Sequence, residues 1–262
     1  MSVAGIPLYP ELALSSFLLL IVIYFFGFFV KGALGMGAMT PTVLFGAWVI
    51  GAHHAVLLAL VCNLFSQVQF LPEGFRYGDR AFTLRAVVPL FAAIALGVWI
   101  FGRLDDSGLE LVVGFVLGGI VLLDATGLSK WIEARFRGHP SLFIIAATIS
   151  GLISGIIGAG GLFILAAFLK VVCPEPRKFR ATMLLIITLA VIWRATTFAV
   201  GGFITPQLLL ESAVLIPAIV AGGWVGMKFF HSISADRFNL FFRIFLIAAA
   251  ASLMWRGLVK LF

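Results

Sequence analysis

Long apolar runs alternate along the chain with short polar or basic connectors, and the order of long and short runs repeats once. Runs of about 20 apolar residues have the length of a helix that spans a bilayer. The pattern predicts one all-helical, polytopic transmembrane domain over 1–262, made of two repeats over about 12–126 and 141–262 and a basic connector over 127–140. The predicted helical runs are 12–30, 41–50, 55–71, 82–101 and 109–126 in the first half, and 141–157, 162–172, 181–200, 207–229 and 238–258 in the second.

A glycine-rich break interrupts the start of each half. It reads GALGMGAMTPT from Gly32 in the first half and GIIGAGGLF from Gly155 in the second. Glycine costs roughly 1 kcal/mol relative to alanine inside a helix, so three glycines within six residues favour unwinding. A continuous helix over 12–50 would be roughly 58 Å long, about twice the hydrocarbon thickness, so the break must redirect the chain into a hairpin.

The two breaks are candidate substrate sites. Within a membrane, unwound backbone is tolerated only where it is buried in protein or lines a cavity, and paired breaks are typical of transporter binding sites. The alternative is that the glycines only allow helices to pack closely. The residues concerned are Gly32, Gly35, Gly37, Thr40 and Pro41 in the first break, and Gly155, Gly158, Gly160 and Gly161 in the second.

The distribution of basic residues predicts the topology. If the short runs do not cross the membrane, the basic connectors fall evenly on both sides. If every run crosses, four basic connectors share one side, and the other side keeps only Arg103, Arg256 and Lys260. Positive charge gathers on the cytoplasmic side, so we expect ten crossings with both termini outside. Five crossings per half would make the halves inverted repeats, an architecture that serves alternating access.

Composition narrows the class of protein. Of 262 residues, 62% are hydrophobic and 11% are charged, whereas globular proteins have about 25% charged residues. The net charge of +7 lies in connectors, where it signals topology and lipid contact rather than nucleic-acid binding. Cys62 and Cys173 have no metal or disulfide spacing and are expected to be free thiols. The N-terminal run lacks a cleavage pattern, so we expect a retained first helix.

The two glycine-broken segments, GALGMGAMTP and SGIIGAGG, in a hydrophobic chain with two similar halves, resemble the sulfite exporter TauE/SafE family, also described as sulfonate uptake permeases. The resemblance covers essentially the whole chain. It implies a secondary transporter of small sulfur-containing anions, such as sulfite, sulfoacetate or other organosulfonates, in a bacterial inner (cytoplasmic) membrane. The first break departs from the family pattern because GMGAM lacks a longer glycine run, so the halves are expected to contribute unequally.

Arg194 is the strongest candidate among the polar side chains inside apolar runs. It lies in IITLAVIWRATTF, with no carboxylate in its own run. A central arginine is costly in a membrane, and its planar fork of donors suits the oxygens of sulfite or a sulfonate. The alternative is that Arg194 lies near the helix end and extends to the interface, with Trp193 as an aromatic anchor.

Asn63, Ser66 and Gln67 share one helical face in the third run of the first half. Each can donate hydrogen bonds to an anion without burying a net charge, although hydrogen bonding between helices is an equal alternative. Thr188 lies at a comparable depth in the second half. Thr40 and Pro41 begin a short helix whose free N–H groups and dipole favour an anion.

Other polar residues are expected to have lesser roles. Lys31 is expected to extend to the cytoplasmic interface, and His53 and His54 are expected in a loop, where adjacent histidines make a poor metal pair. We expect no buried Asp or Glu and therefore no carboxylate proton relay. Ser154 has no histidine in a neighbouring run to act as its base, so an intramembrane enzyme is disfavoured.

These patterns together predict a carrier that alternates access between two inverted halves. We expect its anion to bind between the two glycine breaks, with Arg194 as counter-charge and Asn63 and Gln67 as donors. An anion channel is the alternative, because a glycine-broken helix pair can also line a pore. No cofactor or metal is expected; the expected partners are the small anion and membrane lipids, not nucleic acid, and a homo-oligomer is left open.

Overall fold

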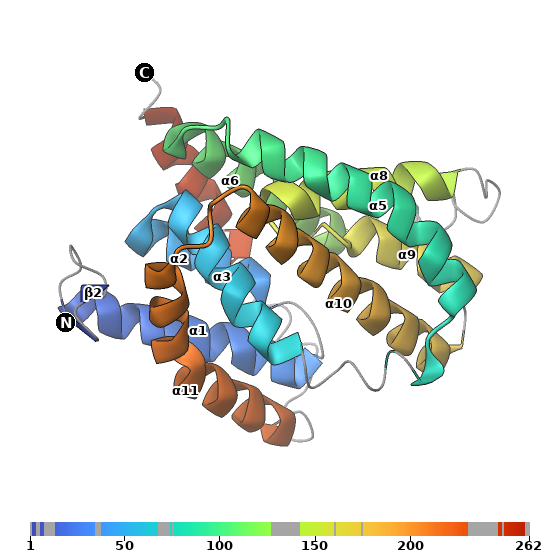
Figure 1. The fold of residues 1–262 in the computed structure, drawn as a ribbon, viewed down its shortest axis with the longest axis horizontal. Coiled ribbons are helices and arrows are strands. Elements are labelled where there is room, and N and C mark those ends of the chain that lie inside the picture. Colours follow the sequence, from blue (N-terminus) through green and yellow to red (C-terminus); the bar gives the residue numbers. More distant parts are fainter. Residues whose placement is uncertain are drawn as a thin grey trace. The chain divides into compact units, whose positions relative to one another are not determined.

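The structure is a computed structural model that describes residues 2–3, 6–7, 14–34, 38–67, 74, 76–126, 142–159, 161–173, 175–229, 246–247 and 249–259. Apart from a short antiparallel pair, β1 (Ser2–Val3) and β2 (Ile6–Pro7), its elements are helices (Figure 1). They are α1 (Leu14–Leu34), α2 (Met39–Ile50), α3 (Ala52–Gln67), α5 (Arg80–Phe101), α6 (Asp106–Ala125), α8 (Leu142–Ile156), α9 (Phe163–Val172), α10 (Pro176–Val200) and α11 (Pro206–Phe229).

The helices confirm an all-helical, polytopic membrane protein. Each predicted run between 12 and 229 corresponds to one helix. Within the described ranges, four helices are long and apolar enough to cross a membrane: Leu14–Gly32, Arg80–Phe101, Lys178–Val200 and Pro206–Lys228. The outward face of α5 is apolar, with Leu84 71% and Val88 70% exposed. Such a face suits contact with lipid.

One helix ends and the next begins within each break, but Gly32 and Gly155, the first glycine of each break, are still helical. α1 ends at Leu34 and α2 begins at Met39, while α8 ends at Ile156 and α9 begins at Phe163. In the second break, Ile157, Gly158 and Ala159 are not helical. Gly35, Gly37 and Gly160 lie outside the described residues, as do 238–245 and 248 of the last predicted run. The described part of that run, 246–247 and 249–258, is helical.

The chain divides into two compact units that do not follow the two halves of the sequence. The first unit comprises Met1–Ser66, Asp105–Gly118 and Ala199–Phe262, and so combines α1, α2 and α3 with α11. The second comprises Gln67–Leu104 and Gly119–Phe198, and so combines α8, α9 and α10 with α5. Each unit therefore contains the first three helices of one half and the fourth predicted helix of the other half, while α6 is divided between the units.

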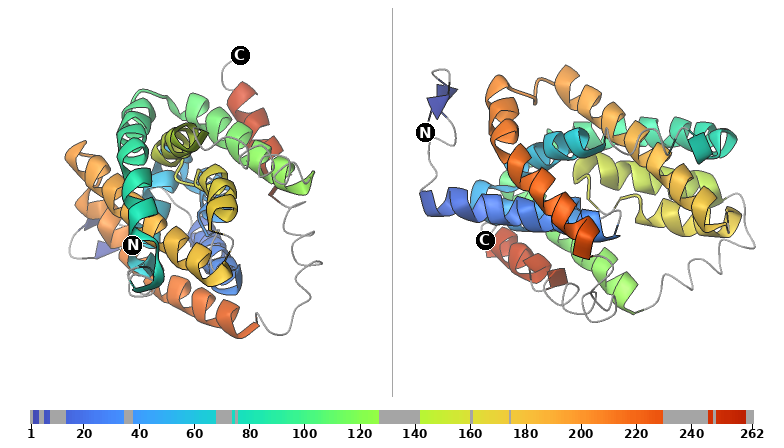
Figure 2. Two further views of the ribbon diagram at one scale, coloured as in Figure 1. Left: turned by 90° about the vertical axis from the view of Figure 1, so that its right-hand side faces the viewer. Right: turned by 90° about the horizontal axis from the view of Figure 1, so that it is seen from below.

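In the first unit, α1 packs against α11 (Figure 2). Glycines make the close approach of the two helices possible. A Cβ atom at Gly32 would overlap the carbonyl oxygen of Gly223, and one at Gly222 would overlap the carbonyl oxygen of Phe25. Backbone-to-backbone contact of this kind is typical of membrane helix pairs, because small residues let the helices approach.

In the second unit, α5 packs along α8 in the same manner. A Cβ at Gly155 would lie 2.5 Å from the Ile94 carbonyl oxygen, and one at Gly97 would lie 2.5 Å from that of Leu152. Gly32 and Gly155 thus serve helix packing within their units.

Candidate functional site

Arg194 lies in the interior of the second unit. Its side chain, on α10, is 2% exposed. Nε donates a long hydrogen bond of 3.4 Å to the carbonyl oxygen of Gly155 at the end of α8, and the guanidinium carbon lies 5.1 Å from the ring centroid of Phe198. Among the described residues, neither Nη1 nor Nη2 has a hydrogen-bond partner. The side chain is therefore directed into the unit rather than outward to an interface.

Trp193, the neighbour of Arg194, contacts α5. Its ring stacks on Phe91 with a centroid distance of 4.8 Å, and its Nε1 donates to the Phe91 carbonyl oxygen at 3.0 Å. This indole is thus held by a helix of its own unit, which fixes the rotation of α10 about its axis and with it the direction of Arg194.

The second break makes room for the guanidinium. Gly158 has a φ of +76°, a conformation that side chains disfavour. A Cβ at this position would overlap Nη1 of Arg194. Gly158 is consequently required twice, once by its backbone conformation and once by the volume that the guanidinium occupies.

Two serines complete the second break. The hydroxyl oxygen of Ser150 on α8 accepts a hydrogen bond of 3.1 Å from the backbone N–H of Leu165, in the first turn of α9. A Cβ at Gly161 would overlap the hydroxyl oxygen of Ser154 and would lie 2.8 Å from the carbonyl oxygen of Ser150. Glycine at 161 therefore lets the start of α9 lie directly on the end of α8.

This arrangement has a clear electrostatic requirement. A buried cation is costly unless it is paired, and donors without acceptors add to that cost. Two guanidinium N–H groups on neighbouring nitrogens match two oxygens of a carboxylate, phosphate, sulfite or sulfonate. The second break of the chain thus holds a site chemically suited to an oxyanion.

The first unit contains a second buried cation. Lys31, at the end of α1, is 7% exposed, and its Nζ donates to Asn63 Oδ1 at 2.7 Å and to Ser66 Oγ at 2.5 Å, both on α3. The prediction that Lys31 extends to the interface is wrong, because the amide and hydroxyl of α3 hold its ammonium group inside. The sequence places Lys31 beside the break but does not indicate which helix faces it.

The remaining predicted site residues are buried or half-buried. Gln67 is 2% exposed, and Thr188 is 3% exposed with its hydroxyl donating to the Leu184 carbonyl oxygen at 2.7 Å. Thr40 is half-buried and Pro41 is buried in the first turn of α2. In the part of the chain that is described, no side chain caps this helix start.

Two buried carboxylates contradict the expectation that there would be none. Glu110 on α6 and Glu211 on α11 are each 1% exposed. His53 and His54 lie in the first turn of α3 rather than in a loop, which is a second correction. The signal was available in the sequence, because both glutamates lie inside predicted apolar runs.

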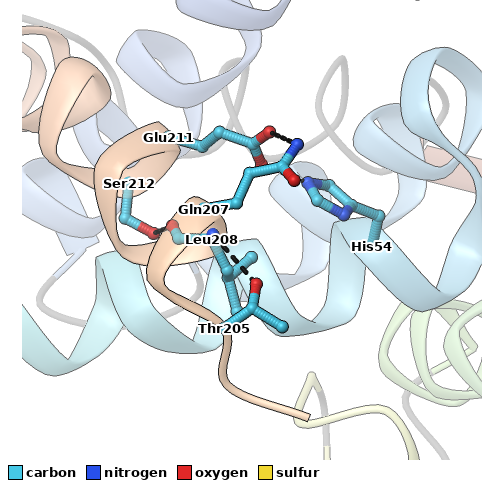
Figure 3. A network of polar contacts seen from close by, with 6 residues as sticks. All are labelled: His54, Thr205, Gln207, Leu208, Glu211 and Ser212. Atoms are coloured by element: carbon cyan, nitrogen blue, oxygen red, sulfur yellow. Dashed lines mark hydrogen bonds and ion pairs between the residues drawn. The ribbon is translucent and has the colours of Figure 1, made fainter. Parts of the chain in front are cut away.

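The histidines bind acidic partners within the first unit. His54 Nε2 lies 2.6 Å from Glu211 Oε2, and Gln207 Nε2 donates to Glu211 Oε1 at 2.9 Å (Figure 3). His53 Nδ1 lies 2.6 Å from Asp106 Oδ1, at a more exposed position. The start of α3 is thus tied to both α6 and α11 through imidazole–carboxylate contacts.

Comparison with known proteins gives a consistent result. A family model described as "Sulfite exporter TauE/SafE" matches residues 19–253. A curated protein of Cupriavidus necator, "Probable sulfite/organosulfonate exporter TauE", is 24% identical over 198 residues, which cover 74% of this chain and 76% of that protein. No solved structure matches the chain.

Proposed function

Because the chain belongs to the sulfite exporter TauE/SafE family, we propose that it exports a small sulfur-containing anion, sulfite or an organosulfonate, across a bacterial inner membrane. The family is one of multi-pass membrane transporters, so the chain is a transporter and not an enzyme. The name of the Cupriavidus relative supports the substrate class, and the matched region includes both breaks and Arg194.

The observation that carries the proposal is the buried guanidinium of Arg194. Its Nη1 and Nη2 lack partners in the described ranges, while the contact of Nε with Gly155 and the space at Gly158 hold it in place. Two sulfonate or sulfite oxygens would accept hydrogen bonds from the two Nη atoms. The pairing would neutralise the buried charge, so the site would favour an anion over a neutral or cationic solute.

Transport would proceed by alternating access between two inverted halves. The pairing of helices supports the repeat: the first predicted helix of each half packs on the fourth of the other, α1 on α11 and α8 on α5. In both units a buried cation also joins the helix before the break to the third helix of the same half. The cation lies on the first helix in one half and on the third in the other, so the halves are chemically unequal.

The experiment that tests this function is counterflow in proteoliposomes. Vesicles loaded with unlabelled sulfite, sulfoacetate, taurine, sulfate or acetate are diluted into a trace of the same labelled anion. A carrier accumulates label transiently against its gradient, whereas a simple pore only equilibrates it. We expect accumulation with a sulfur-containing anion and not with acetate.

Arg194→Gln tests the site itself. We expect counterflow to fall roughly 10- to 100-fold, because hydrogen bonds to a charged group contribute about 1.5–3 kcal/mol. Arg103→Gln is the matched control: Arg103 belongs to the same unit, but it is exposed and lies over Trp99. Full counterflow in Arg194→Gln would show that this arginine is not part of the anion site. Equilibration of the label without accumulation in the native protein would instead indicate a channel.

A further inference from the structure

A polar cluster in the first unit has no role in the site described above. Glu211 lies in the second turn of α11, and its carboxylate is 1% exposed. One of its oxygens contacts the imidazole of His54, and the other accepts a hydrogen bond from the side chain of Gln207 (Figure 3). A buried carboxylate in a membrane helix is costly, and such residues typically mark ion or proton pathways.

His54 connects this carboxylate to the surface. Its side chain is 36% exposed, whereas that of Glu211 is 1% exposed. α3 begins at Ala52, directly after Gly51 with a φ of +79°, so His54 stands at the end of its helix. A proton can therefore reach the imidazole from outside the unit without passing through the apolar interior.

The pair changes its charge when it takes up one proton. With a neutral imidazole and an ionised carboxylate, His54 and Glu211 together carry one negative charge. With a protonated imidazole, the two groups form an ion pair with no net charge. Histidine is the side chain that titrates nearest neutral pH, and a buried net charge costs more than a paired one. Proton binding therefore lowers the free-energy cost of moving this part of the unit out of contact with water.

Among the described residues, the neighbouring titratable groups do not combine a buried carboxylate with a histidine partner. His53 pairs with Asp106, but that carboxylate is 62% exposed, so its charge stays solvated. Glu110 is buried, but it has the permanent cation of Arg256 at 4.0 Å. Farther along α3 and α11, Cys62 is a fully buried thiol with Ser212 beside it.

Lys31 belongs to a different part of the unit. Its neighbour Gly32 packs against Gly223, which lies 12 residues after Glu211 on α11. That separation corresponds to roughly 18 Å along the helix axis. At this distance Lys31 does not compensate the charge of Glu211 directly.

We propose that the His54–Glu211 pair is a proton-binding site, and that proton uptake there is coupled to movement of the anion. The inference rests on the proposed transport function. Proton entry coupled to anion exit would draw on the full proton-motive force, since both movements carry positive charge inward. Gln207 acts as a positioning residue, because it holds Glu211 Oε1 in either protonation state.

Proton flux in proteoliposomes tests the proposal. The vesicles contain a pH-sensitive dye, and potassium with valinomycin clamps the membrane potential. The substrate is the organosulfonate that gives the largest counterflow, because a sulfonate is a strong acid and does not carry protons through the bilayer in its neutral form. We expect an outward sulfonate gradient to acidify the interior in the native protein.

Two variants separate coupling from transport. In Glu211→Gln and in His54→Gln, we expect counterflow of the sulfonate to stay within about threefold of native, while gradient-driven acidification falls at least tenfold. Asp106→Asn is the matched control, since it alters the exposed pair at the same end of α3 and should keep proton movement. Size-exclusion chromatography and counterflow itself verify that each variant is folded.

The outcomes distinguish the two proposals. Native counterflow without acidification overturns proton coupling and leaves the transport function standing. Absence of native counterflow overturns the transport function. Acidification that persists in both His54→Gln and Glu211→Gln would show that the proton binds at a different site. If neither variant folds, the native protein still decides, because proton movement driven by the sulfonate gradient is required by the proposal.

Discussion

At the scale of single residues, the position of the Arg194 guanidinium depends on the missing side chain at Gly158. We predict that Gly158→Ala reduces counterflow at least tenfold, because the new methyl group would overlap Nη1 of Arg194 and displace the guanidinium that we propose binds the anion. Initial rates at a fixed external concentration of labelled sulfonate, normalised to protein reconstituted, measure this effect.

Gly202→Ala separates collision from backbone strain. Gly202 has a φ of +77°, almost equal to that of Gly158, but a Cβ there would have nothing within 4 Å. Both substitutions carry the cost of the left-handed conformation, roughly 1–2 kcal/mol. If Gly202→Ala lowers counterflow as much as Gly158→Ala does, strain and not contact with Arg194 explains the loss.

The sequence indicated some of these residues and missed others for identifiable reasons. Arg194 stood out because a lone arginine in an apolar run has few explanations. Lys31 did not stand out, because its partners Asn63 and Ser66 follow more than 30 residues later in the sequence. The apolar pattern of their helix does not determine which of its faces points toward Lys31. Glu211 lay near the start of a run, where a carboxylate is usually taken for an interfacial residue.

At the scale of helices, the paired glycines limit how α5 and α8 can approach. We predict that Gly155→Ala lowers the unfolding temperature in detergent, because its Cβ would lie 2.5 Å from the Ile94 carbonyl oxygen and force the helices apart. Overpacking of this kind typically costs about 1–3 kcal/mol. Thermal unfolding followed by tryptophan fluorescence measures the shift.

Gly119→Ala is the control for helix propensity. Gly119 lies within α6, and a Cβ there would have nothing within 4 Å. Alanine should therefore stabilise this helix by about 0.5–1 kcal/mol. Equal shifts for the two variants would show that the contact at Gly155 is not tight.

The positions of the helices were easier to predict from the sequence than the pairs in which the helices pack. Each run between 12 and 229 became a helix because a continuous apolar stretch in a membrane protein must satisfy its own backbone. The association of α1 with α11, and of α5 with α8, could not be predicted from the apolar runs. Glycines indicate that a helix has a surface for close packing, but they do not indicate which other helix packs against it. The two units consequently cut across the two halves.

At the scale of the whole molecule, the ten-crossing topology with both termini outside remains a prediction. Single cysteines at Gly202 and Ser107 should react with a membrane-impermeant maleimide in intact cells, and one at Gly138 should not. The native cysteines give little background, because Cys62 is fully buried and Cys173 is 5% exposed. Labelling at Gly138 in unbroken cells would end the ten-crossing topology and weaken the inverted-repeat proposal.

The glycine contact between α1 and α11 also has a consequence for synthesis. Gly32 leaves the ribosome about 190 residues before Gly222, which corresponds to roughly 10–40 s at 5–20 residues per second. Throughout that interval, the small-residue surface of α1 must face lipid or the insertion machinery. The interval between the synthesis of α5 and that of its partner α8 is much shorter. The first unit therefore matures last, and a chain terminated before Pro206 leaves α1 in the membrane without its partner.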